Sequence, residues 1–165
     1  MVFRSQLILD TNVLIDLHRG NVLNLFFRLP YRFVSPDVII AELQEPSGES
    51  LISLGLQSGE LSGERVLEVE MLSGHHANIA INDLFALVLA ESLDAPLLTG
   101  DDRLRRLATR HNIPVHGTLW TLDEMVDKRT LKPVEASRAL NNMLAGGSRL
   151  PSSECQQRLR TWENM

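Results

Sequence analysis

Runs of apolar residues alternate along the chain with stretches in which apolar residues recur at helical spacing. The first run, residues 7–9, stops at Asp10 and is followed by a helical pattern that ends at Gly20. A short, continuous apolar run is typical of a strand buried on both faces of a parallel sheet, and glycine is typical of a helix C-terminus. This segment therefore predicts a strand, a turn and a helix.

The same alternation continues through most of the chain. Further strands are predicted at residues 33–34, 64–70, 96–99 and 113–116. Helices are predicted at residues 36–44, 47–56, 84–91, 101–111, 118–128 and 133–145, and a capping box of Ser153 and Gln156 predicts a last short helix. Alternating strands and helices predict an α/β fold, with a mostly parallel sheet and helices on both faces.

The strand predicted at residues 64–70 depends on a different pattern from the others. Polar and apolar residues alternate from Glu64 to Glu70. Such alternation is typical of a strand with one exposed face, so we expect this strand near an edge of the sheet.

The composition is that of one soluble globular domain, with 165 residues, 44% of them hydrophobic and 22% charged. No apolar run approaches the ~20 residues of a membrane span. Asp10 interrupts the apolar N-terminal segment before it reaches the length of a signal peptide core. A single cysteine, Cys155, cannot form an internal disulfide, which agrees with a reducing compartment. We therefore expect a cytoplasmic protein that does not associate with a membrane.

Four acidic residues are expected at one end of the predicted sheet, where open α/β sheets bind their ligands. Asp10 directly follows the first strand, and Asp101, with Asp102 beside it, follows the strand near residue 97. Asp83 lies near the start of the helix before that strand. Glu42 lies in the helix that begins at residue 36, among apolar neighbours.

Each of these acids also has a purely structural explanation. Asp10 and Asp101 suit helix N-caps, and Asp83 suits a helix start, where the macrodipole favours negative charge. Glu42 suits the one solvated stripe of a helix that is otherwise buried. The functional interpretation gains weight because four separate segments deliver carboxylates to the same end of one sheet.

Carboxylates gathered in this way call for a cation. Two like charges ~4 Å apart repel each other by about 4 kcal/mol at an effective dielectric constant of ~20. Hard oxygen ligands without a histidine or cysteine cluster favour Mg²⁺ or Mn²⁺ over zinc. Such ions activate water and orient phosphodiesters, so hydrolysis of a phosphodiester is the expected chemistry.

Several of these segments resemble the PIN-domain family of nucleases. The similarity runs from about residue 6 to about residue 130, and it is carried by residues 7–17, the helix with Glu42, residues 82–84 and residues 97–104. The resemblance implies a three-layer α/β/α fold with about five strands and a metal-dependent endoribonuclease activity. It also implies that an acidic quartet binds the metal, with Asn12 and Thr99 holding the site by hydrogen bonds. The quartet would consist of Asp10, Glu42, Asp83 and Asp101.

Residues 113–120 also resemble prokaryotic members of this family, many of which are VapC-like toxins. This resemblance implies an RNA substrate, a cognate antitoxin and a homodimer. The chain departs from the family pattern in the doubled Asp101 and Asp102 and in a longer helical tail. We therefore expect a nuclease domain over residues 1–130 and a helical C-terminal extension over residues 131–165.

Basic residues follow the predicted site on one helix. Arg103, Arg105 and Arg106 form either a solvated helix face or a track for the RNA backbone. His75 and His76 are interpreted as surface residues, because adjacent helical residues point apart and no third soft ligand is close in sequence. The formal net charge of −5 does not exclude RNA, since two divalent cations would offset most of it.

Two other functions remain open from the sequence. A haloacid-dehalogenase-like phosphatase also places an aspartate after its first strand, but its motif needs a second aspartate where this chain has Asn12. The other alternative is a catalytically silent PIN fold that binds RNA or regulates without cutting it.

Overall fold

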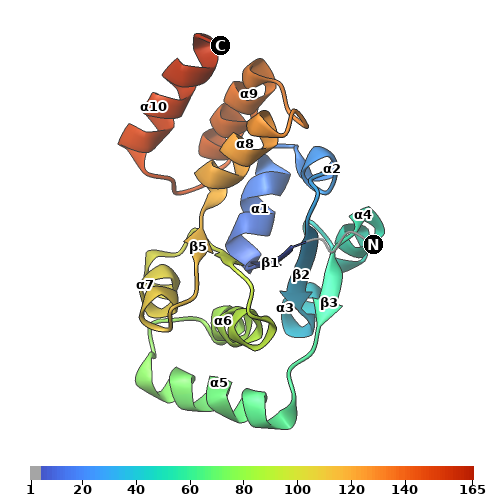
Figure 1. Ribbon diagram of the computed structural model, residues 1–165, viewed down its shortest axis with the longest axis vertical. Helices are drawn as coiled ribbons and strands as arrows, with labels where there is room; N and C mark the ends of the chain where they lie inside the picture. Colours follow the sequence, from blue (N-terminus) through green and yellow to red (C-terminus); the bar gives the residue numbers. More distant parts are fainter. Residues whose placement is uncertain (1–4) are drawn as a thin grey trace.

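The computed structural model describes residues 5–165, which form a five-stranded, all-parallel sheet with helices on both faces (Figure 1). The strand order is β3-β2-β1-β4-β5, so the first strand is central. The strands are β1 (Gln6–Leu9), β2 (Arg32–Pro36), β3 (Gln57–Gly59), β4 (Leu97–Leu98) and β5 (Val115–His116). The predicted α/β/α fold with a parallel sheet of about five strands is therefore confirmed.

Helices connect and cover these strands. In chain order they are α1 (Thr11–Arg19), α2 (Leu23–Phe26), α3 (Asp37–Glu42), α4 (Gly48–Leu54), α5 (Gly63–His75), α6 (Ile81–Leu93), α7 (Asp102–Arg110), α8 (Thr118–Asp127), α9 (Pro133–Ala145) and α10 (Ser152–Glu163). Helices α8 and α9 pack with α1 on one side of the sheet, while α6 packs against β1 and β2 on the other, with α5 outside it (Figure 1). None of the helices within residues 5–165 combines the length and the apolar character that a membrane crossing requires.

The register of the central strands positions the site. Ile8 and Leu9 of β1 pair with Leu97 and Leu98 of β4, and all four side chains are fully buried. Their burial on both faces explains why these strands are continuously apolar. Because the two strands are parallel and in step, the residues that follow them emerge side by side at one edge of the sheet. Asp10 is the first of these residues.

The prediction of a strand at residues 64–70 is wrong, because this segment lies within the helix α5. Ser62 caps the helix by accepting a hydrogen bond from the Arg65 amide at 3.3 Å. Val66, Val69 and Leu72 recur every three residues, and this helical period coincides in part with the alternation that indicated a strand. The structure instead has an edge strand at β3, which was not predicted. This strand has three residues, and its polar sequence lacks the apolar pattern that indicates a strand.

The predicted helical tail is confirmed, and α9 has the predicted bounds. Helix α9 packs against α1, and α10 packs against α9 with Cys155 and Trp162 buried. The start of α10 differs from the prediction, because Pro151 is its N-cap and the Ser153 side chain caps nothing. Similarly, Pro36 ends β2, so α3 begins one residue later than expected.

Candidate functional site

Asp10 lies at the end of β1 and is fully buried. Its Oδ1 accepts a hydrogen bond from the Val13 amide at 2.9 Å, so the residue is the N-cap of α1. Its Oδ2 accepts a hydrogen bond from the hydroxyl of Thr99, the residue after β4. The side chain therefore caps a helix and also lies at the edge where the two central strands end.

Thr99 joins Asp10 to a second acid. The backbone amide of Asp101 donates a hydrogen bond to the Thr99 hydroxyl oxygen at 3.0 Å. Asp101 is also the N-cap of α7, with its Oδ1 accepting from the Arg103 amide at 2.9 Å. One threonine thus fixes the relative positions of the segments that carry the two acids.

Asp83 lies in the first turn of α6 and is buried. Burial and, to a smaller extent, the charge of Asp101 together raise the pKa of Asp83 to about 6. Burial also raises the pKa of Asp10 to about 7, against the opposing effect of its hydrogen bonds from Thr99 and Val13. The charges of Asp83 and Asp16 make smaller contributions to that increase, so the two neighbouring carboxyl groups act electrostatically on Asp10.

Glu42 is connected to this cluster through one neighbour. It is the last residue of α3, its side chain is exposed, and it accepts a hydrogen bond from the side-chain amide of Asn82. Asn82 directly precedes Asp83 in α6. The structure therefore brings the four predicted acids to the same end of the sheet from four separate elements, and Glu42 is the most peripheral of them.

The acids do not form a preorganised metal site among the residues that the structure describes. Within residues 5–165, no group of three or more histidine, cysteine, aspartate or glutamate side chains is arranged to hold an ion. The chemistry of the donors nevertheless fits a hard divalent cation, because all are carboxylates. Neither Asp10 nor Asp83 forms an ion pair with any described residue, and burial disfavours the charged form of both. A cation bound between them would supply the positive charge that this pair lacks.

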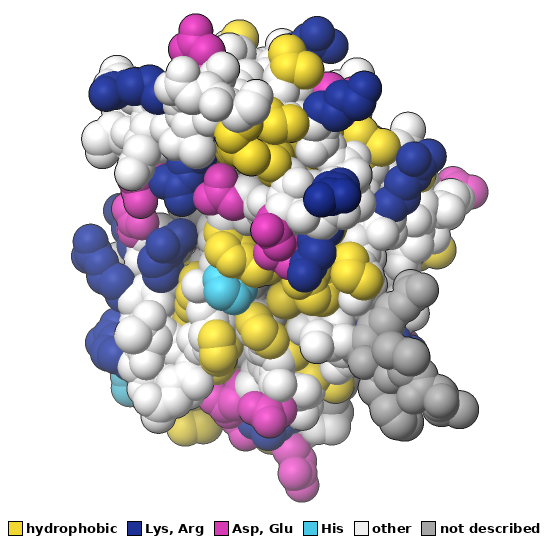
Figure 2. Space-filling model, turned by 45° about the horizontal axis from the view of Figure 1, so that its top comes forward, with side chains coloured by type: hydrophobic (Ala, Val, Ile, Leu, Met, Phe, Trp, Pro, Cys, Tyr) yellow, Lys and Arg dark blue, Asp and Glu magenta, His cyan; other side chains and the backbone are white. Residues whose placement is uncertain are grey.

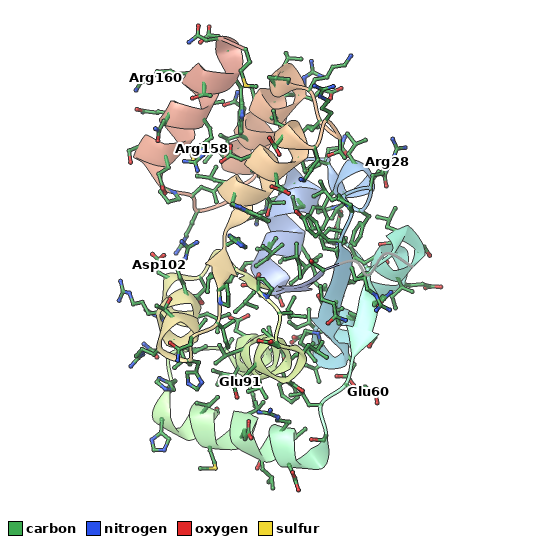
Figure 3. The ribbon with its side chains drawn as sticks, viewed as in Figure 1. Arg28, Glu60, Glu91, Asp102, Arg158 and Arg160 are labelled. Atoms are coloured by element: carbon green, nitrogen blue, oxygen red, sulfur yellow. The ribbon has the colours of Figure 1, made fainter. Side chains whose placement is uncertain are left out.

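A cleft of about 610 Å³ opens beside this cluster. It is lined by residues of α1, the start of α7 and the loop before α10: Asn12, Ile15, Asp16, Arg19, Gly100, Asp101, Asp102, Arg103, Gly147 and Arg149. Asn12 is exposed there, and no hydrogen bond to an acid involves its side chain among the described residues. Asp102 is the exposed first residue of α7 (Figure 3).

The three arginines predicted to bind RNA all lie on α7. Arg103 donates a hydrogen bond to the carbonyl oxygen of Asn78 at 3.1 Å, and Arg105 donates one to that of Thr99 at 3.5 Å. Arg106 is exposed. Figure 2 shows Lys and Arg side chains gathered along the left edge of the molecule, in the region of α7 and the adjoining end of α10, with some acidic side chains between them.

Asp16 is a site residue that no sequence motif indicated. It is buried, and its Oδ2 accepts a hydrogen bond from Thr118 at 2.9 Å while its Oδ1 accepts one from Ser148 at 2.6 Å. It therefore ties α1 to α8 and to the loop before α10. The only sequence signal was a charged residue between the apolar Ile15 and Leu17 of a predicted helix.

Replacing Asp16 with alanine is expected to lower the free energy of unfolding by about 3 kcal/mol, because the buried hydroxyls of Thr118 and Ser148 lose their charged acceptor. In a chain of this size the loss corresponds to a fall in Tm of roughly 6–12 °C. Asp16→Asn is the matched control, since an amide accepts from one hydroxyl and donates to the other, and it should cost about 1 kcal/mol or less. A loss below about 1 kcal/mol in Asp16→Ala, measured by thermal unfolding, would show that these hydrogen bonds do not stabilise the fold.

Comparison with known proteins identifies the family. A family model described as a PIN domain matches residues 6–164. The chain belongs to the PIN-domain family. The match includes the helical tail, so the family pattern covers this PIN domain from β1 to α10.

One solved structure supports the fold of this PIN domain. It is a PilT N-terminus domain protein from the hyperthermophilic archaeon Sulfolobus solfataricus P2. The two chains share 13% sequence identity and superpose with a TM-score of 0.54, over 73% of this chain and 93% of the other. At this identity the similarity concerns the fold alone. A search of curated proteins finds no match.

Proposed function

We propose that this PIN domain is an endoribonuclease that depends on Mg²⁺ or Mn²⁺. The observation that carries the proposal is the environment of Asp10, a fully buried carboxyl group with no cationic partner among the described residues and with a pKa raised to about 7. A strongly perturbed carboxyl at the carboxyl end of a parallel strand is typical of a functional site. PIN domains are generally metal-dependent nucleases, which agrees with this interpretation.

In this proposal Asp10, Glu42, Asp83 and Asp101 hold the ion. A divalent cation at such a site supplies Lewis acidity, which activates water and offsets the charge that develops on a phosphodiester. The chain's own contribution is to fix the donors in advance. The hydroxyl of Thr99 and the amide of Val13 set the orientation of Asp10, while the backbone of Asp101 is fixed by the same threonine.

RNA as the substrate is supported by charge and by the family resemblance. Arg103, Arg105 and Arg106 follow Asp101 directly along α7, so cations lie next to the proposed metal site. These side chains suit the phosphates of a bound strand. We also propose a toxin role, a cognate antitoxin, a homodimer, a cytoplasmic location and a domain boundary near residue 130. These proposals rest on the sequence and its resemblance to VapC-like toxins.

A second candidate function is an RNA-binding PIN fold that does not cut. It is favoured by one observation, namely that Asp10 and Asp101 each cap a helix and therefore have a structural role that needs no metal. In that case the cleft and its arginines would still bind RNA, and the acids would serve only as helix caps and hydrogen-bond acceptors.

Removal of the metal tests the proposal. Purified protein incubated with a mixed RNA pool should cut it in Mn²⁺ and not in EDTA, and the products should end in linear phosphates, because the nucleophile would be water and not the ribose 2′-hydroxyl. Products that end in 2′,3′-cyclic phosphates, formed equally in EDTA, would indicate a different nuclease chemistry. RNA binding without any cleavage in Mn²⁺ would favour the silent alternative.

A further inference from the structure

A second cleft of about 740 Å³ adjoins the one beside the acidic cluster. The two share Gly100, Asp102 and Arg149 as lining residues, so they lie side by side, and we refer to them together as the groove. One wall of this second cleft comes from α7 and from the turn between β5 and α8. The opposite wall comes from residues 148–158, which include the start of α10. We call this part of the groove the tail cleft.

Three arginines line the tail cleft. The guanidinium group of Arg105 lies close to Gly117, where a Cβ atom would come within 2.8 Å of Nη2. Arg149 is exposed and forms no ion pair with any residue from 5 to 165. Arg158 is held by Asp123, with 3.1 Å between Nε and Oδ2. Two acids, Asp102 and Glu154, also line the cleft. Among the residues that the structure describes, Arg105 and Arg149 are the arginines of this cleft that form no ion pair.

The loop that carries Arg149 is fixed to the body of the protein. The neighbouring Ser148 is buried, its hydroxyl donates to Asp16 at 2.6 Å, and its backbone amide donates to the carbonyl oxygen of Met143 at 2.9 Å. Arg19 donates to the same hydroxyl at 3.3 Å. The backbone that carries Arg149 is therefore held in place by these hydrogen bonds, on the side of the groove opposite the arginines of α7.

The tail cleft also offers apolar and aromatic surface. Leu119, Leu150, Pro151 and the half-buried Trp120 contribute to its lining. One face of the Trp120 ring is stacked on His116 at a centroid distance of 4.0 Å, which fixes the indole in place. Cations combined with a fixed aromatic ring are the features of grooves that bind single-stranded nucleic acid.

We infer that residues 148–158 form the far wall of a groove for single-stranded RNA, in which Arg149 and Arg105 contact backbone phosphates on the path from the acidic cluster. The inference rests on the proposed function for the identity of the substrate. On this inference the helical tail has a specific function: it forms the second wall of the substrate groove, opposite the wall formed by α7 and the turn before α8.

The test uses the full chain with a short fluorescent single-stranded RNA, in EDTA to prevent cleavage. Arg149→Glu should weaken binding about tenfold, and Arg149→Ala should lower the slope of log affinity against log salt by about 0.7, the value for one phosphate contact on a single strand. Arg160→Glu is the matched control, because Arg160 is an exposed residue of the same tail that does not line the cleft (Figure 3). It should leave both quantities unchanged.

Cleavage in Mn²⁺ separates this inference from the proposed function. Arg149→Glu should raise KM about tenfold and leave kcat within about twofold, as expected for the loss of a contact made equally in the ground and transition states. If the wild-type protein cuts RNA and Arg149→Glu has the KM and affinity of Arg160→Glu, the inference is wrong and the proposed function stands. If the wild-type protein binds RNA through Arg149 but does not cut it, the proposed function is wrong instead. Equal affinity for duplex RNA would overturn the assignment to single strands.

Discussion

Replacing Asp10 with asparagine is expected to reduce the rate of RNA cleavage by at least about a thousandfold, equivalent to about 4 kcal/mol of lost transition-state stabilisation. Asparagine has almost the same shape and still accepts the hydrogen bond from the Val13 amide, but it carries no negative charge for the cation. The measurement is single-turnover cleavage of RNA in Mn²⁺, with the variant and the wild-type protein at equal concentration.

The fold of the Asp10→Asn variant should survive, which makes its loss of activity interpretable. Burial penalises the ionised form of Asp10, so removal of the charge should leave the free energy of unfolding without metal at neutral pH unchanged or higher. Asp94→Asn is the matched control, because Asp94 is exposed at the opposite edge of the sheet, before β4, and asparagine tolerates its left-handed backbone. Cleavage by Asp10→Asn at the rate of Asp94→Asn would exclude Asp10 from the active site.

The position of the acidic cluster was predictable because it depends on where buried strands end. Asp10 and Thr99 each follow a short apolar run, and parallel pairing of the two runs brings them together without any further information. Helix α5 was not predictable from alternation alone, since an exposed helix with a single fully buried residue, Val69, has only a weak helical pattern. Leu67 and Met71 are exposed there, so its apolar residues do not mark one face.

The contacts that complete the site come from distant parts of the chain, and the sequence carries no local sign of them. Asp16 and Ser148 are hydrogen-bonded across 132 positions, and either residue alone resembles an ordinary helix or loop residue. The same is true of Arg149, whose place in the groove depends on how α9 packs against α1. Local patterns determine where the buried strands end, whereas the tail's part in the groove depends on tertiary packing.

Stabilisation of the protein by Mn²⁺ should depend strongly on pH. Folding raises the pKa of Asp10 from 3.8 to about 7 and that of Asp83 to about 6, so the folded protein without metal holds protons that the unfolded chain has released. The contribution of these two groups to stability therefore falls as the pH rises from about 4 to about 7, and it stays low above that range. A bound cation must displace the same protons, so its affinity rises over the same interval and then levels off.

Thermal unfolding with and without Mn²⁺ measures this linkage directly. The increase in Tm caused by Mn²⁺ should be absent near about pH 5, appear between about pH 6 and 7, and be fully developed near about pH 8. Asp94→Asn should behave as the wild-type protein, whereas Asp10→Asn should lose most of the increase at every pH. An increase in Tm that is the same at the two ends of this range, or that survives in Asp10→Asn, would mean that the ion binds elsewhere on the protein. Because the titrating groups belong to the acidic cluster itself, a pH-dependent increase that disappears with Asp10 would locate the ion at the end of β1 without any measurement of cleavage.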